Sequence, residues 1–354
     1  MINASKEFEN TIYGDGNKKY IAKATIALTD DAVLEIDSSD ILVGGVQKTE
    51  GTSSSGSFDI GFCSCNQLTL KLNNVNGKFS TYDFNDAKVV IYVGLRLSET
   101  EEYIKKGIFT VDDPVSNGPH ISLICLDNMH KLDKKITGLA GSTAGQMINN
   151  IANSCGVELA NVSFDGYNKE LTPLDDAEQY TYRQALGYIC QAIGAFARFN
   201  VDGKLEIKWY DIGAFEQADN LDGGSFDNEI PYSTGDSADG GDFTYSEASN
   251  YDGGTFRQSK RYHHIYSLKN VDLSTDDVVI TGIKVTNDED SYLYGEEGYV
   301  LEVEDNPLTT GREKDIATYV GNKIIGMTFR PLSVTAQSNP LIEAGDSAYV
   351  SHNG

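Results

Sequence analysis

Short runs of alternating apolar and polar residues fill the first 133 positions, and they constrain the fold more than any other feature. Residues 20–28 alternate in this way, and Gly, Asn, Asp and Ser clusters such as 52–56 and 73–77 separate the later runs. Those runs cover residues 33–36, 41–46, 58–62, 68–72, 88–97, 104–111 and 121–126. Alternation with regular turn signals predicts antiparallel strands in a sandwich or barrel. A short helix near 4–12 is expected to precede them.

The apolar period changes between residues 134 and 211. Thr143 with Gln146, and Thr181 with Gln184, have the spacing of a helix capping box, and an apolar stripe follows each pair. Glycines 156 and 194 are expected to end the two helices. This pattern predicts a small α+β domain.

A hairpin is expected to complete that domain. Residues 196–201 and 205–210 alternate and flank Asp202-Gly203, a dipeptide typical of hairpin turns. Trp209 is the only Trp of the chain and is expected to anchor the domain core.

The segment 212–256 differs in composition from the rest. It has no Lys or Arg, and Asp-Gly-Gly-x-Phe occurs three times, at 222–226, 239–243 and 252–256. Gly-Gly permits turns, so we expect an extended acidic arm that covers another surface. Calcium binding is the alternative, because hard cations prefer several carboxylate and carbonyl oxygens. The uneven spacing of the copies does not fit a known calcium repeat.

The last segment, 257–354, predicts a second β domain with one helix. Thr310 and Glu313 have a third capping-box spacing and precede an apolar stripe. Strands are expected at 278–285, 299–303, 328–336 and 347–350. Residues 351–354 resemble a hairpin turn with no returning strand, which would leave an open sheet edge. We therefore expect the sequence to be the N-terminal part of a longer protein.

The charge balance excludes several classes of partner. Asp and Glu number 53 against 28 Lys and Arg, which gives a formal net charge of −25. Nucleic-acid binding depends on cations that neutralise phosphates, and anionic membranes also attract basic segments, so neither partner is expected. The sequence has no apolar run long enough to span a membrane, and residues 1–20 contain no apolar stretch of signal-peptide length, so no signal peptide is expected.

No catalytic, cofactor-binding or metal-binding residues are predicted. The sequence lacks the motifs of phosphate-binding loops, serine hydrolases and zinc proteases. Cys63 and Cys65 are expected to be buried thiols on one face of a strand. His263 and His264 would point to opposite faces of a strand and could not bind one ion together. A pair of catalytic carboxylates stays open as an alternative, since the chain has many acids.

Several segments resemble tail proteins encoded by phages and prophages of Gram-positive bacteria. They are the opening residues 1–8, Ile104-Lys105-Lys106-Gly107-Ile108-Phe109-Thr110-Val111-Asp112-Asp113-Pro114, Cys125-Leu126-Asp127-Asn128-Met129, Asn306-Pro307, and Asn339-Pro340-Leu341-Ile342-Glu343-Ala344-Gly345-Asp346. Their order and spacing are similar to those of the baseplate hub family, the fold of the hub beneath the T4 tail tube. That fold also forms the N-terminal part of tail-associated lysins.

The resemblance implies two tail-tube-like β-barrels, at 1–133 and 257–354, that flank the α+β domain at 134–211 and the arm at 212–256. Three copies would form a pseudo-sixfold ring that meets the tail tube or a distal tail protein. It also implies a structural virion component made in the host cytoplasm, with DNA passing through its channel. Tip or lysin modules, including an enzymatic one, would lie beyond Gly354. The alternative is an extracellular β-rich protein that binds or hydrolyses glycans.

Overall fold

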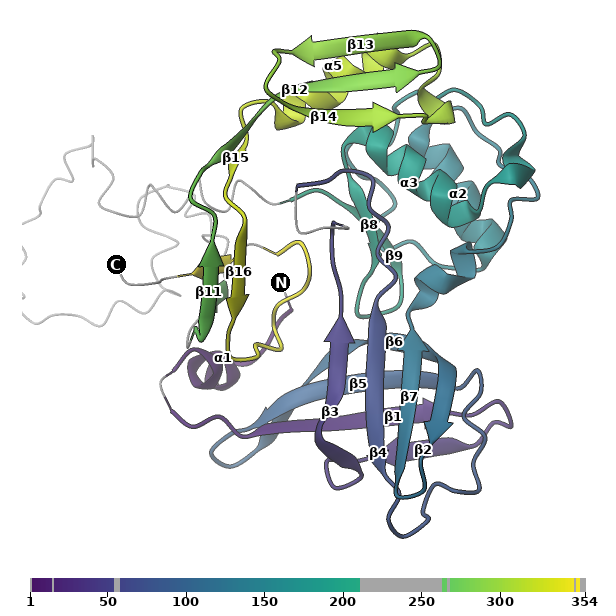
Figure 1. Cartoon of the computed structure of the whole chain (residues 1–354). Helices are drawn as coiled ribbons and strands as arrows, with labels where there is room; N and C mark the ends of the chain where they lie inside the picture. The colour runs from purple at the N-terminus through teal and green to yellow at the C-terminus, as the bar shows by residue number, and fades with distance from the viewer. Residues whose placement is uncertain are drawn as a thin grey trace, which may run out of the picture.

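The computed structural model describes residues 2–14, 16–53, 58–210, 263–265, 268–346 and 348–350, and it shows an α+β protein that is mainly β (Figure 1). The strands form a large N-terminal sheet, a hairpin beside two helices, and a C-terminal group of smaller sheets. The predicted acidic arm at 212–256, with its Asp-Gly-Gly-x-Phe copies, lies outside the described residues.

The N-terminal sheet has seven antiparallel strands in the order β2-β1-β5-β6-β7-β4-β3. Their bounds are β1 (Tyr20–Ala27), β2 (Val33–Ile36), β3 (Ile41–Thr49), β4 (Gln67–Asn73), β5 (Lys88–Arg96), β6 (Glu101–Ser116) and β7 (His120–Leu126). One face of the sheet curls around a core of aliphatic side chains and Phe rings. Within the described residues no pairing joins β2 to β3, so the sheet is open where a barrel was predicted.

Helix α1 (Lys6–Tyr13) confirms the predicted N-terminal helix and packs beside this sheet. The Ser5 hydroxyl caps it by accepting from the Phe8 N–H at 3.1 Å. Glu7 accepts from the Ser98 hydroxyl at 2.6 Å, which ties the helix to the β5–β6 turn. Phe8 is fully buried in a separate small core that also contains Leu341 of the C-terminal segment.

The predicted α+β part contains two helices and a hairpin. Its elements are η1 (Asn128–Leu132), α2 (Ala144–Cys155), η2 (Ala177–Gln179), α3 (Tyr182–Ile193), β8 (Phe196–Phe199) and β9 (Leu205–Lys208). Gly156 and Gly194 end the helices in the left-handed conformation, as predicted. The capping box at Thr181 is complete. At α2 the Thr143 hydroxyl accepts from Gln146 N–H at 3.4 Å, but the Gln146 side chain accepts from Ser142 N–H at 3.0 Å rather than from the N-cap.

The C-terminal strands form three groups. The bounds are β10 (His263–Ile265), β11 (Asn270–Leu273), β12 (Val278–Asn287), β13 (Asp290–Gly295), β14 (Tyr299–Glu304), η4 (Pro307–Thr309), α5 (Glu313–Ile324), β15 (Thr328–Phe329), β16 (Leu332–Thr335) and β17 (Ala348–Val350). Strand β12 pairs with β13 and β15 antiparallel and with β14 parallel. Strands β11 and β16 form an antiparallel ribbon, and β10 and β17 a parallel one. No closed barrel is present among these described strands.

The capping box predicted at Thr310 is wrong. The 3₁₀ turn η4 ends directly before this position, with Thr310 as its C-cap, and α5 begins three residues after Thr310 with Arg312 as its N-cap. The Glu313 side chain accepts instead from Asn287 Nδ2 at 3.0 Å and from Gly311 N–H at 2.9 Å. The carboxylate therefore joins the helix to β12 as well as to the turn before it.

One large core joins regions that are distant in sequence. Buried side chains of α2, α3 and α5 pack together with those of β12 and β14. Residues 58–66, predicted in part as a strand of the first sheet, also enter this core: Ile60 is buried there, and Cys63 forms a parallel bridge with Ala197 of β8. The connection between β3 and β4 thus leaves its own sheet and packs against the helical part.

Candidate functional site

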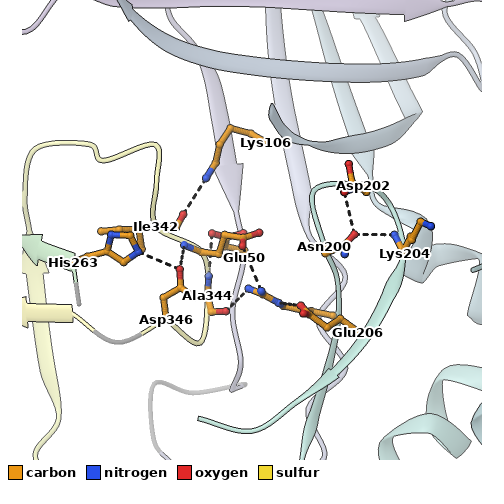
Figure 2. Close-up of polar contacts among 12 residues, drawn as sticks. Glu50, Lys106, Asn200, Asp202, Lys204, Glu206, His263, Ile342, Ala344 and Asp346 are labelled. Carbon is orange, nitrogen blue, oxygen red and sulfur yellow. Dashed lines mark hydrogen bonds and ion pairs between the residues drawn. The ribbon is translucent and has the colours of Figure 1, made fainter. Parts of the chain in front are cut away.

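Residues 339–346, which we call the junction loop, contact both the N-terminal sheet and the β8–β9 hairpin (Figure 2). They are among the residues that resemble the hub family. Asn339 fixes the start of the loop, since its side chain accepts from Leu341 N–H at 3.0 Å. At the other end Asp346 accepts from Glu343 N–H at 3.1 Å. The buried Leu341 side chain packs in the α1 core.

Lys106 holds the junction loop from the side of the first sheet. Ile91 pairs with Gly107 and Tyr92 pairs with Lys105, so Lys106 is the extra residue of a β-bulge. Its Nζ donates to the carbonyl oxygens of Pro340 at 2.7 Å and Ile342 at 3.0 Å. Burial lowers the pKa of Lys106 to about 8, and the nearby Lys48 adds to that shift. The ammonium group is therefore desolvated and stabilised mainly by backbone oxygens of the loop.

Arg198 holds the same loop from strand β8. Its Nε lies 2.9 Å from Glu206 Oε2, and its Nη1 donates to the Ala344 carbonyl at 2.6 Å. Glu343 adds a longer ion pair at 3.5 Å. Only 5% of Arg198 is exposed, and although burial opposes ionisation, Glu343 and Glu206 raise the pKa of the guanidinium. The side chain thus joins the hairpin to the loop with its charge fully compensated.

The connection between β3 and β4, and strand β10, also contact the junction loop. Glu50, which pairs with Lys48, accepts from Ala344 N–H at 3.2 Å. Asp346 Oδ2 lies 3.3 Å from Nε2 of the buried His263, whose Nδ1 is 2.9 Å from the Tyr13 hydroxyl. Burial opposes the shift, but contact with His263 lowers the pKa of Asp346.

A second contact region joins the first sheet to the helical part. Asn128 Nδ2 donates to the Gly203 carbonyl at 2.8 Å, and on the same hairpin turn Asp202 pairs with Lys105 at 2.8 Å. Asp127 caps η1 by accepting from Met129 N–H at 3.0 Å. Burial raises the pKa of Asp127 to about 6, with the Cys65 thiol alongside. The segment 125–129, which also resembles the hub family, thus serves to join modules.

Asn306 plays the same role between α3 and the C-terminal sheet. It is fully buried, and its Nδ2 donates to the Tyr188 carbonyl at 2.9 Å. Its Oδ1 accepts from Leu308 N–H at 3.1 Å, which caps η4. All five resembling segments therefore contact distant parts of the chain, since Phe8 of the opening segment, which forms the start of α1, packs in the same core as Leu341.

The Cys, Trp and His residues that the sequence analysis singled out take part in packing and in contacts between segments. Cys63 and Cys65, expected as buried thiols on a strand, are only half-buried, and a single bridge at Cys63 takes the place of that strand. Burial raises the pKa of Cys65 to about 12, which keeps its thiol protonated. Trp209 lies half-buried at the core edge, with its ring centroid 5.7 Å from that of Phe58. His263 contacts Asp346, and the His264 side chain lies outside the described residues. No three metal-ligating side chains gather among the residues that the structure describes.

No helix in the described part of the chain is long and apolar enough to cross a membrane.

The sequence had no means of identifying the junction loop as a site, because its contacts come from Lys106 and Arg198, more than 140 residues away. The resemblance was the one signal that marked these residues.

Comparison with known proteins gives remote structural likenesses only. No family model matches the sequence, and no curated protein matches it. A tail protein from Neisseria meningitidis MC58 has a TM-score of 0.45 at 9% identity, covering 85% of this chain and 76% of that one. The 43 kDa tail protein of prophage MuSo2 from Shewanella oneidensis has a TM-score of 0.38 at 9% identity, covering 85% and 78%. A Francisella PdpA-VgrG complex has a TM-score of 0.40 at 10% identity, covering 84% and 46%. With TM-scores below 0.5, these likenesses assign neither fold nor function to this chain.

Proposed function

We propose that this chain is a structural protein of a phage tail and forms the hub at the tail tip. The observation that carries the proposal is the placement of the resembling segments. Residues 104–114, 125–129, 306–307 and 339–346 all contribute contacts that fix one module against another. Such positions set the relative orientation of β modules, which is what a ring-forming protein must control.

The proposed hub is a ring of three copies, each with two tube-like β modules, at 1–133 and 257–354, around the α+β part at 134–211. The seven-stranded curled sheet is the first module. In the second module the described strands form two short ribbons and a mixed sheet with a parallel pair. The proposed partners of each chain are the other two copies, a distal tail protein or tube ring, and tip or lysin modules.

The proposed place of the protein is the virion tail tip, and its role is structural rather than catalytic. The net charge of −25 supports a channel that repels the DNA that passes through it. A calculated potential with a neutral or basic inner wall in the assembled ring would contradict that part of the proposal.

The test combines labelling with mass measurement. Gold-labelled antibodies against this chain are expected to mark the tail tip of intact virions. Light scattering of the chain mixed with its distal tail protein is expected to give a complex with three copies of the 38.6 kDa chain. Gold label along the tube, or no label on virions, would contradict the tail-tip assignment. A complex with a single copy of this chain would contradict the threefold ring.

Glycan binding is the second candidate, and a group of aromatic rings favours it. Phe58 contacts Trp209, Tyr210 and Phe329 with ring centroids 5.6–5.7 Å apart. Tyr299, 37% exposed, continues the group from Phe329. Partly exposed rings can stack on sugars, so calorimetry with cell-wall glycans distinguishes this function from a hub that binds only tail proteins.

A further inference from the structure

The connection between β3 and β4 lies in a narrow space between helix α3 and strand β8. Gly61 N–H donates to the Ala195 carbonyl at 2.7 Å, and Ser64 N–H donates to the Ala197 carbonyl at 3.1 Å. Gly61 has a φ of +85°, and a Cβ there would lie 2.1 Å from Cγ of Gln191 on α3. The backbone on either side of Cys63 is therefore hydrogen-bonded along β8, and at Gly61 it lies close against α3.

This placement brings two thiols together. A Cβ at Gly187 of α3 would lie 3.9 Å from Cys63 Sγ, and Cys190 is three residues further on the same helix face. The neighbouring Cys63 thiol, together with burial, raises the pKa of Cys190, and the Cys63 thiol itself donates to the Gly61 carbonyl at 3.7 Å. Cys63 is partly exposed, whereas Cys190 is fully buried.

We propose that Cys63 and Cys190 form a disulfide when the protein meets a small disulfide oxidant such as oxidised glutathione. The Cys63 thiolate attacks one sulfur of the oxidant, which forms a mixed disulfide and releases one glutathione thiolate. Cys190 then loses its proton, and its thiolate attacks the Cys63 sulfur and expels the second glutathione. Two protein thiols are oxidised, one oxidant disulfide is reduced, and both thiol protons end on the two glutathione molecules.

The exposure of the two residues sets the order of these steps. A small oxidant reaches Cys63 from solvent, and Cys190 needs to reach only the neighbouring sulfur. The high pKa of Cys190 makes the second step faster at alkaline pH. The crosslink would tie the excursion of the N-terminal sheet to α3 and close a long loop, which restricts the unfolded chain. The inference does not depend on the proposed function.

The test counts thiols in the full chain before and after treatment with oxidised glutathione at pH 8.5. Denatured and unoxidised protein has five thiols. The expected result is three thiols, a tryptic peptide that joins Cys63 to Cys190, and a higher unfolding temperature that a reductant returns to its starting value. Oxidation at pH 7 is expected to be slower.

Cys65→Ser is the matched control, because Cys65 lies two residues away on the same segment beside Asp127. This variant is expected to fall from four thiols to two, whereas Cys63→Ser keeps all four. Three results would overturn the inference in the unmutated protein: five thiols after oxidation, a Cys63–Cys65 link, or glutathione that stays on Cys63. Peptide mapping of that protein decides between them even where a variant does not fold.

Discussion

Asp127 and Lys106 are buried ionisable groups whose contacts are mostly with the backbone. Neither forms a salt bridge with another described residue, and burial shifts the pKa of each toward the neutral form. Asp127 caps η1, and Lys106 donates to the junction loop. Each pKa shift makes the stability of the folded protein depend on pH. Substitution of one residue at a time therefore measures the contribution of Asp127 and of Lys106 separately.

Asp127→Asn is expected to remove a pH dependence between pH 4 and pH 6. The folded pKa of about 6 lies above the ordinary value, so the stability contributed by the protonated carboxyl is complete below pH 4 and is lost as the pH rises through 6. Asn keeps the cap to Met129 without a charge. The variant should gain up to about 3 kcal/mol over the parent at pH 7.5, from a shift of about two pKa units. Urea unfolding at pH 4.5 and 7.5 measures this, and the exposed Glu99→Gln should run parallel to the parent.

Lys106→Met is expected to change the alkaline side of the profile. The folded pKa of about 8 lies below the ordinary 10.5, so between these values the unfolded chain binds a proton that the folded chain does not. The parent therefore gains stability as the pH rises from 8 to 9.5, and the variant lacks that gain. Lys105→Met, on the adjacent residue that pairs with Asp202, is the control and should keep the rise. Equal slopes for all three proteins would show that Lys106 titrates normally.

At the scale of elements, local signals were sufficient for the helix ends and the hairpin. The Thr181 capping box and the left-handed Gly194 involve neighbours within a few residues, and both are confirmed. The hairpin at Asp202-Gly203 is also confirmed, although its turn starts at Asn200, whose side chain accepts from the Asp202 and Lys204 N–H groups. Each of these features depends on a few adjacent residues, which is why alternation and spacing identify them.

Contacts between distant segments could not be predicted in this way. The sequence shows residues 58–62 as an alternating run, but their partner is β8, more than 130 residues later, rather than a strand of the first sheet. The bulge at Lys106 depends on how β5 and β6 align, and alternation alone does not reveal one extra residue. For the same reason the barrel was predicted closed, since no local pattern says whether edge strands β2 and β3 meet. The domain boundaries stay predictions.

Gly61→Ala tests how tightly the β3–β4 excursion packs on α3. The new methyl group would meet Gln191 Cγ and, at 2.9 Å, the Gly187 carbonyl, so the loop must shift. Strain from the positive φ adds to this, and the cost should exceed 2 kcal/mol, on the order of overpacking plus backbone strain. Gly118 also has a positive φ, but a Cβ there would meet nothing within 4 Å. Gly118→Ala should therefore lower the free energy of unfolding by the backbone strain alone. Equal losses in urea unfolding would mean that the close approach costs nothing.

Arg198→Met tests the attachment of the junction loop to the hairpin. The substitution leaves the Glu206 carboxylate and the Ala344 carbonyl without their buried partner. Breaking one side of a buried ion pair costs about 3–5 kcal/mol. Hydrogen exchange should accelerate most at 339–346 and less in α2. Lys204→Met removes the exposed pair with Glu158 and should leave the free energy of unfolding almost unchanged, because solvent screens this pair. Unchanged exchange in the loop would show that its other contacts, those of Lys106 and Leu341 among them, hold it without Arg198.

At the scale of the whole molecule, the net charge of −25 opposes any assembly of identical copies. A ring of three copies would bring three like net charges together, and in dilute salt this repulsion reaches about 30 Å. The ring that we propose must therefore use surfaces where charge is low, or gain its stability from the distal tail protein. The salt dependence should show whether charge repulsion or the apolar contacts limit assembly, because salt screens the repulsion and leaves apolar contacts in place.

The proposed trimer is accordingly expected to form more tightly at 0.5 M than at 0.05 M sodium chloride. Screening shortens the reach of charge repulsion to a few ångströms near 0.5 M, so the apparent trimer dissociation constant should fall at least tenfold, as an order of magnitude. Sedimentation equilibrium at both salt concentrations measures this, with and without the distal tail protein. Weaker assembly at high salt would mean that opposite charges hold the copies together. In that case basic residues such as Lys71 and Lys88, exposed on the first sheet, become the contacts to test.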